Sequence, residues 1–202
     1  MGVGRYLQLS FSFRGCRVSV SFYFFALLCA AAFLDRSGVM LWGLLAALLH
    51  ECGHLAVMLL IPGHSPREIN VTPFGMRIEN SPLAEFAGGN ILVLFAGSGV
   101  NFICTAVTFG FLPEFAAVSF VLGVLNLLPV KGMDGGGILL RLLERRMRES
   151  SALMMSDIIS WVTLCILAAC GIYILAVTRY NFTLLCATAA LAIAGIKEKP
   201  QW

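Results

Sequence analysis

The chain has 202 residues, of which 59% are hydrophobic and 12% are charged, and its mean hydropathy is +0.88. Soluble domains are about 45–50% apolar, so these values exclude an ordinary soluble protein and indicate one that crosses a membrane several times. The net charge of +3 is small, and the basic residues cluster between apolar runs. That arrangement sets membrane topology and gives no indication of nucleic-acid binding.

The N-terminal part of the chain predicts a basic arm and two membrane spans. Residues 1–17 carry three arginines and are expected to lie at the membrane surface. The apolar run 18–34 predicts a first transmembrane helix of about minimal length. A tight turn is expected at 35–38, and the apolar run 39–61 predicts a second span that Pro62-Gly63 ends.

A polar segment, 64–90, follows the second span. Within it, β-branched residues flank the sequence Pro73-Phe74-Gly75, which predicts a short β-hairpin over residues 69–79. A third span is expected over about 91–112, where small residues would allow close helix packing.

The C-terminal half predicts a helix that is interrupted at membrane depth. Residues 115–128 are too short to span as a regular helix, and they lead into a glycine-rich stretch around Asp134. Such backbone is tolerated in a membrane only where it is buried in protein or lines a cavity. A basic amphipathic helix is expected over 138–149, followed by spans at about 155–177 and 182–196, the last of them short. The predicted fold is an all-α polytopic membrane protein with about six transmembrane helices, a short membrane-associated β-hairpin and a broken helix.

The positive charges predict an orientation. With this set of spans, 12 of the 14 Lys and Arg residues fall on one side of the membrane, and only Arg36 and Arg179 fall on the other. The positive-inside rule therefore places both termini in the cytoplasm.

The most informative motif is His50-Glu51-Cys52-Gly53-His54, inside the second predicted span. Ionisable side chains are costly in hydrocarbon, so such a cluster indicates a functional site. Residues i and i+4 share one face of a helix, so His50 and His54 can bind one Zn²⁺, and Glu51 can then act as general base on water. Cys52 lies about 200° around the helix from His50 and is not expected to be a ligand. The alternative hypothesis is a polar packing cluster.

A catalytic zinc ion takes a third protein ligand. Asp134 is the favoured candidate, because it lies at a glycine-flanked break where an unpaired carboxylate would be costly and where the backbone can bend. Its alternative role is to cap the following helix, and the two roles can coexist. His64, just past the motif helix, is interpreted as a solvated loop residue.

Two amides and the cysteines allow more than one interpretation. Asn101 and Asn126 lie in or beside spans, where they either hydrogen-bond between helices or steady the substrate backbone or the oxyanion. The seven cysteines form no Cys-x-x-Cys pair and are interpreted as small buried hydrophobic residues.

Taken together, the motifs resemble site-2 proteases, which are intramembrane zinc metalloproteases. The sequence has four such motifs in the family's order, covering about residues 40–145: His50-Glu51-Cys52-Gly53-His54, Pro73-Phe74-Gly75, Ala96-Gly97-Ser98-Gly99-Val100-Asn101, and Asn126-Leu127-Leu128-Pro129 through Met133-Asp134-Gly135-Gly136. The hairpin and the size look most like the sporulation branch, whose founding member processes the membrane-tethered precursor of the mother-cell factor sigma-K.

The resemblance implies one Zn²⁺ per chain, bound by His50, His54 and Asp134, with Glu51 as catalytic base and a cleft that faces the cytosol. Substrate or oxyanion binding is expected at a further set of residues, namely Asn101, Asn126, Pro73, Phe74 and Gly75. The chain departs from the family at Gly97-Ser98, where Ala-Gly-Pro is frequent, and at Gly137, where arginine is frequent. A single domain over 1–202 is expected, with its catalytic core at about 39–145 and no CBS or PDZ domain.

The predicted function is therefore intramembrane zinc endopeptidase activity on membrane-tethered proteins, such as a pro-sigma factor or another substrate of regulated proteolysis. The expected location is the bacterial inner membrane, and the expected partners are the protein substrate, the lipid bilayer and membrane inhibitor or activator proteins. Two alternatives are a metal transporter or sensor that uses the same ligands, and an inactive relative that binds membrane proteins. Glu51 is superfluous to simple metal binding, and the intact set of His50, Glu51, His54 and Asp134 argues against an inactive relative.

Overall fold

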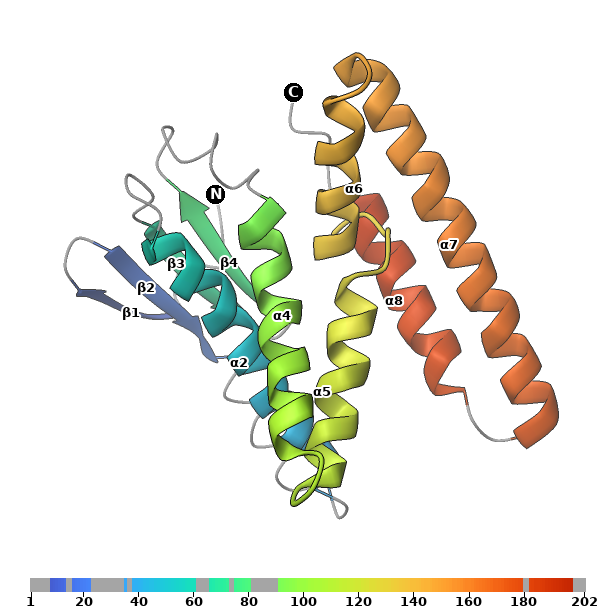
Figure 1. The fold of residues 1–202 in the computed structure, drawn as a ribbon, viewed down its shortest axis with the longest axis horizontal. Helices are drawn as coiled ribbons and strands as arrows, with labels where there is room; N and C mark the ends of the chain where they lie inside the picture. Colours follow the sequence, from blue (N-terminus) through green and yellow to red (C-terminus); the bar gives the residue numbers. More distant parts are fainter. Residues whose placement is uncertain are drawn as a thin grey trace. The chain divides into compact units, whose positions relative to one another are not determined.

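The computed structural model describes most of the chain, namely residues 8–13, 16–22, 35, 38–60, 66–72, 75–80, 91–179 and 182–197. The chain forms two compact units, Met1–Val124 and Leu125–Trp202, whose elements are labelled in Figure 1. Most described residues are helical, as the sequence predicts for a helical membrane protein.

The first unit is built around two long apolar helices, α2 (Val39–Leu60) and α4 (Ile91–Thr108), which pack side by side. Their backbones approach closely at Gly53 of α2, where a Cβ atom would lie 2.8 Å from both the Ala96 carbonyl oxygen and Val100 Cγ2. Small residues permit this approach, which is how helices associate inside a membrane.

Asp35 fixes the start of α2. Its carboxylate accepts hydrogen bonds from the backbone N–H groups of Gly38 at 2.9 Å and Met40 at 2.7 Å. Gly38 has a φ of 76°, a conformation that glycine adopts without strain, so the chain turns here into the helix.

A third helix of this unit, α5 (Pro113–Asn126), follows a short turn and ends just past the division between the units. It packs against α4, since Thr105 Oγ1 donates to the Ala116 carbonyl oxygen at 3.2 Å, and the rings of Phe102 and Phe120 lie 6.0 Å apart. At 14 residues α5 is too short to cross a membrane as a regular helix, in agreement with the prediction.

The first unit also contains a four-stranded sheet, which is larger than the expected hairpin. The strands β1 (Gln8–Phe13), β2 (Cys16–Ser21), β3 (Pro66–Thr72) and β4 (Gly75–Asn80) lie in the order β1-β2-β3-β4. The β1–β2 and β3–β4 pairs are antiparallel, and β2 runs parallel to β3 with Val18 opposite Ile69.

The prediction that a first span begins at Val18 is wrong, because β2 occupies this position. Polar and apolar residues alternate through Arg17-Val18-Ser19-Val20, a period that favours a strand, and pairing with β3 supplies the partner that such a strand needs. The remainder of the expected span, residues 23–34, lies outside the described residues.

The second unit consists of α6 (Asp134–Glu144), α7 (Glu149–Thr178) and α8 (Thr183–Lys197). The basic helix expected over 138–149 begins earlier and ends earlier, because residues 145–148 form the turn into α7. Helix α7 packs against both α6 and α8. At Gly171 a Cβ atom would lie 2.9 Å from Leu185 Cγ of α8.

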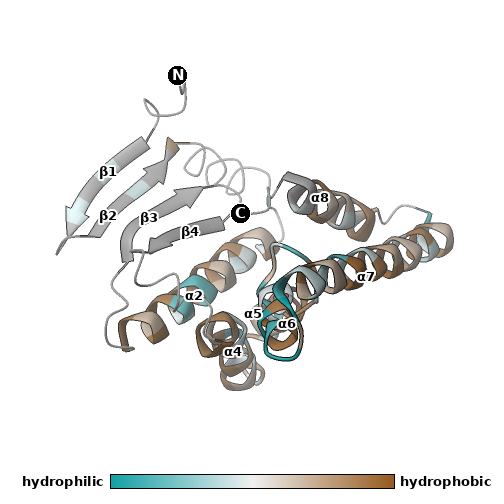
Figure 2. Cartoon of the chain, turned by 90° about the horizontal axis from the view of Figure 1, so that it is seen from above, coloured by the Kyte–Doolittle hydropathy of each residue, from teal (hydrophilic) through white to brown (hydrophobic). Residues whose placement is uncertain are grey.

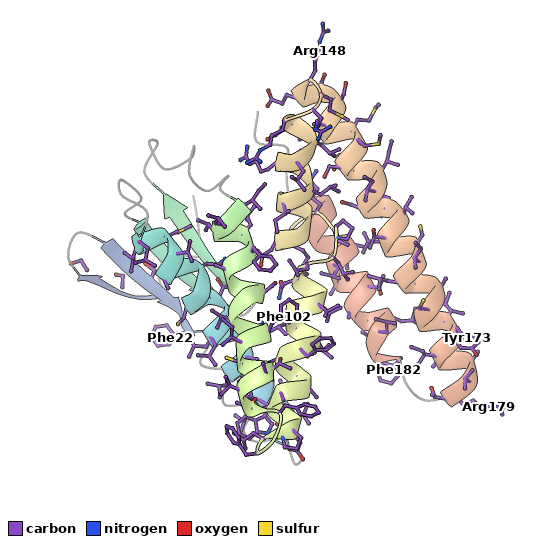
Figure 3. All side chains as sticks on the ribbon, in the orientation of Figure 1. Phe22, Phe102, Arg148, Tyr173, Arg179 and Phe182 are labelled. Atoms are coloured by element: carbon purple, nitrogen blue, oxygen red, sulfur yellow. The ribbon has the colours of Figure 1, made fainter. Side chains whose placement is uncertain are left out.

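Three helices in the described part of the chain are long and apolar enough to cross a membrane: α2, α4 and α7. In Figure 2 these helices carry mainly the colours of hydrophobic residues, and a hydrophilic segment interrupts α2. In Figure 3, Arg148 and Arg179 lie at opposite ends of α7, whose 30 residues extend about 45 Å. Because a bilayer core is about 30 Å thick, α7 is long enough to cross it with polar residues at both ends. The protein is therefore a membrane protein.

Candidate active site

The two histidines of the motif lie on one buried face of α2. His50 and His54 are 5% and 8% exposed, and their Nε2 atoms are 3.1 Å apart. Their rings meet edge-on at an interplanar angle of 84°. The one-turn spacing in the sequence thus brings the two nitrogens to one point, as expected from helix geometry.

Helix α4 contacts the far nitrogen of each imidazole ring. His54 Nδ1 donates to the backbone oxygen of Val93 at 2.7 Å, and the amide nitrogen of Asn101 lies 3.2 Å from His50 Nδ1. Asn101 is fully buried, and it forms the hydrogen bond between helices that was one of its two predicted roles. Both rings are therefore fixed in orientation from the side opposite their Nε2 atoms.

Gly97 of α4 keeps the space beside these Nε2 atoms open. A Cβ atom built on Gly97 would collide with His54 Nε2 and would lie 2.7 Å from His50 Nε2. The missing side chain leaves room for an atom in contact with both nitrogens, which is the space that a shared metal ion requires.

Glu51 and Cys52 follow His50 on α2 and differ in exposure. Glu51 is half-buried, whereas Cys52 is exposed. The catalytic role expected for Glu51 stays a prediction at this point.

Asp134 is the first residue of α6, in the second unit. The N-cap residue is Met133, whose side chain makes no capping hydrogen bond, so Asp134 is the first helical residue and not the N-cap residue that the alternative interpretation made it. Its carboxylate belongs to the first helical turn, where negative charge is favoured by the helix dipole. Cβ atoms on Gly135 and Gly136 would collide with the carbonyl oxygens of Leu127 and Val130, so the glycines after Asp134 let the preceding loop fold against the helix.

The loop that leads to Asp134 is attached to α7. The backbone N–H of Lys131 donates to Ser160 Oγ at 3.1 Å, and Lys131 Nζ forms an ion pair with Asp157 at 3.2 Å. Gly132 has a φ of 87°, which lets the chain turn between these contacts and the start of α6.

The remaining predicted residues lie at the edges of elements or beyond the described part of the chain. Asn126 is the last residue of α5 and is half-buried, and Gly75 is the first residue of β4. Pro73, Phe74 and His64 lie outside the described residues. The sequence analysis did not identify the roles of Gly97 and Val93. A signal for Gly97 was present, since it lies one helical turn before Asn101 and therefore on the same face of α4.

Two buried imidazoles converge on one point, a glutamate follows the first of them, and the helix that carries them is of membrane-spanning length. These features define the class as a membrane metallopeptidase. Comparison with known proteins agrees with this class. The family model of peptidase family M50 matches residues 109–170. This region contains Asp134 and lies after both histidines of the motif. No curated protein matches the chain.

A solved structure with the same fold is the site-2 protease from Methanocaldococcus jannaschii. It superposes with a TM-score of 0.64 at 19% sequence identity, over 95% of this chain and 94% of that one. The match to peptidase family M50 over residues 109–170 and the shared fold support a metalloendopeptidase of the intramembrane type.

Proposed function

We propose that the chain is an intramembrane zinc endopeptidase that holds one Zn²⁺ through His50, His54 and Asp134. The observation that carries this proposal is the 3.1 Å separation of the two Nε2 atoms. A tetrahedral zinc ion with Zn–N distances of about 2.0–2.1 Å would hold two nitrogens about 3.3 Å apart. Two imidazoles and one carboxylate also form a donor set that catalytic zinc sites use, and Gly97 leaves space for the ion.

When bound, the zinc ion would polarise the scissile carbonyl and make water easier to deprotonate. Glu51 is the proposed general base, because it directly follows a ligand on the same helix and is half-buried. It takes a proton from the attacking water and returns it to the leaving amine. Asn126 is proposed to steady the substrate backbone or the developing oxyanion.

The sheet offers a way to bind an extended substrate. Within the described sheet, β1 and β4 are the edge strands, and β4 follows directly on Pro73-Phe74 and begins at Gly75. A substrate strand can add to such an edge through backbone hydrogen bonds, which would hold the peptide unwound for hydrolysis. The proposed substrates are membrane-tethered proteins, such as a pro-sigma factor of sporulation or another target of regulated proteolysis. The proposed location of the protease is a bacterial inner membrane, with both of its own termini in the cytoplasm.

Co-expression of the full chain with a tagged pro-sigma-K-type substrate tests this proposal. The wild type is compared with Glu51→Gln, Asp134→Ala and the control Cys52→Ser, whose side chain is exposed on the same helix as the motif. Immunoblots should show cleavage with the wild type and the control and none with the other two variants. Cleavage that survives Glu51→Gln would refute the mechanism.

The zinc content of the purified variants separates the proposed protease from a metal transporter, a sensor or an inactive binding protein. Glu51→Gln should retain zinc while losing proteolysis, whereas Asp134→Ala should lose zinc as well. If metal binding is retained and no variant, including the wild type, cleaves any membrane-tethered substrate, one of the non-hydrolytic alternatives is favoured.

A further inference from the structure

Three arginines gather where α6 ends and α7 begins. Arg145 is the C-cap residue of α6, Arg146 lies in the turn that follows, and Arg148 is the N-cap residue of α7. All three side chains are exposed, and no ion pair joins them to any residue that the structure describes. This cluster, the arginine turn, therefore presents three unpaired guanidinium groups to its surroundings.

Backbone hydrogen bonds fix the arginine turn. The N–H groups of Arg146 and Met147 both donate to the Leu143 carbonyl oxygen, at 2.8 and 2.9 Å, and the Ala152 N–H donates to the Arg148 carbonyl oxygen at 2.9 Å. Ala152 is fully buried, and α6 packs against α7. The arginines thus extend from an ordered helical hairpin, so a partner that binds them does not have to order the backbone first.

The acidic residues nearby leave the arginine turn positively charged. Glu144 pairs with Arg141 of the same helix at 2.9 Å, so that pair is neutral in itself. Glu149, in the first turn of α7, is exposed and lowers the local charge from +3 to +2. The other end of α7 carries less charge, because Arg179 is the one charged residue of the sequence between 158 and 196.

The length of α7 places the arginine turn at the depth of lipid headgroups. Figure 3 shows Arg148 and Arg179 at the two ends of this helix, whose 30 residues extend about 45 Å. A bilayer with its headgroups is about 40–45 Å thick. When α7 crosses the membrane, its two ends therefore lie in the two headgroup layers, with the greater positive charge at the arginine turn.

Exposed apolar side chains continue this surface away from the arginine turn. Leu142 is 48% exposed and lies three and four residues before Arg145 and Arg146, on the same face of α6. Met155 is 43% exposed and lies seven residues after Arg148, which is two helical turns or about 10 Å along α7. Positive charge followed by apolar surface matches a phospholipid, whose phosphate is joined to hydrocarbon chains.

We propose that the arginine turn binds the headgroup of an anionic phospholipid, with the acyl chains lying along Leu142 and Met155. Guanidinium groups donate paired, charge-assisted hydrogen bonds to phosphate oxygens, and their positive charge favours a lipid with net negative charge over a zwitterionic one. All of these residues belong to the second unit, so the inference depends neither on the metal site nor on hydrolysis. Because α6 begins at Asp134, a bound headgroup holds the helix that carries this residue at one depth in the membrane.

Competition binding to the full chain in nonionic detergent tests the proposal. The probe is phosphatidylglycerol with a fluorophore on one acyl chain, and the competitors are unlabelled phosphatidylglycerol, phosphatidylcholine, inorganic phosphate and a glutamate-rich peptide. Phosphatidylglycerol should displace the probe at least tenfold better than phosphatidylcholine at equal mole fraction, and this advantage should shrink as salt is added. Equal displacement by the two lipids would overturn the proposal. Displacement by inorganic phosphate as good as by phosphatidylglycerol would replace the lipid with a free anion, and better displacement by the peptide would replace it with an acidic protein segment.

Substitutions at the two ends of α7 locate the binding site. A basic residue near an anionic lipid surface contributes about fivefold in affinity, so Arg148→Gln should weaken phosphatidylglycerol binding about fivefold. Arg179→Gln is the matched control, because it removes an exposed arginine from the other end of the same helix, and it should leave the affinity unchanged. An equal loss in both variants would show that the binding is not confined to the arginine turn, which would overturn the proposal.

Replacing the whole cluster separates charge from folding. The triple variant Arg145→Gln, Arg146→Gln and Arg148→Gln should lose about 100-fold in affinity, whereas lysine at the same three positions should retain the affinity within about fivefold. Thermal unfolding without added lipid shows whether each variant is folded, and if the triple glutamine variant is not, the three single glutamine variants replace it. Wild-type affinity in the folded glutamine variants would refute the proposal.

Discussion

Replacing Gly97 with alanine tests whether the space between the two imidazoles is needed for metal binding. The new methyl group would lie 2.7 Å from His50 Nε2 and would collide with His54 Nε2. Non-bonded heavy atoms prefer about 3.5–4.0 Å, so the imidazoles or the helices must move by several tenths of an ångström or more. Because Gly53 already brings α2 against the Ala96 carbonyl oxygen, the helix backbones have little freedom to adjust, and the imidazole rings are the groups that yield.

The expected size of the effect follows from this crowding. Overpacking of a well-packed site typically costs about 1–3 kcal/mol, and 1.4 kcal/mol corresponds to a factor of about ten in affinity. We therefore expect the zinc affinity of Gly97→Ala to fall by about 5–150-fold. Gly99→Ala is the matched control, because its Cβ atom would meet only Phe95 of the same helix, at the ordinary distance of 3.7 Å.

The assay is competition for zinc between the detergent-solubilised protein and a chromogenic chelator, with thermal unfolding of the metal-free variants measured in parallel. Alanine is the better helix former by about 0.5–1 kcal/mol, so the control should be at least as stable as the wild type. Wild-type zinc affinity in Gly97→Ala would refute the argument that the ion occupies this space. A similar loss in Gly99→Ala would show that the effect comes from α4 in general.

Three further predictions concern other parts of the chain. Glu51→Gln should lower the rate of peptide hydrolysis about 10²–10⁴-fold or more with no loss of bound zinc, as measured by cleavage kinetics and metal analysis. Asp157→Asn should change the free energy of unfolding by at most about 1 kcal/mol, because Asp157 and its ion-pair partner Lys131 have side chains that are 51% and 34% exposed, respectively. A larger loss of stability would mean that this ion pair fixes the loop before α6. Gly171→Ala should lower the thermal stability, because the added methyl group would lie 2.9 Å from Leu185 Cγ, and an unchanged melting temperature would show that α8 shifts freely against α7.

Local properties of the sequence determined the membrane character and the central part of the site. Hydrophobicity summed over a window predicts α2, α4 and α7, and the helical period alone places His50 and His54 on one face of α2. These predictions succeed because they involve residues within one or a few helical turns of each other, whose relative positions the helix fixes.

The strand β2 and the start of α6 show where local patterns were insufficient. The run from Val18 is apolar enough for a short span, and only the pairing with β3, about fifty residues away, makes Cys16–Ser21 a strand. Likewise, the glycines after Asp134 predict a loop by their propensity, yet they belong to α6. Tertiary packing overrides propensity here, because Gly135 and Gly136 are buried against the preceding loop, where any side chain would collide with it.

The surroundings of the two histidines were decided by the tertiary structure. Val93, Gly97 and Asn101 lie about forty to fifty residues from the motif, and nothing in their local sequence states which helix they face. The packing of α4 on α2 places a backbone acceptor, an open space and an amide around the imidazoles. The sequence by itself thus determined which residues can bind a metal, whereas the helix packing decided which groups hold the imidazole rings in their orientation, because such contacts depend on distance in space and not along the chain.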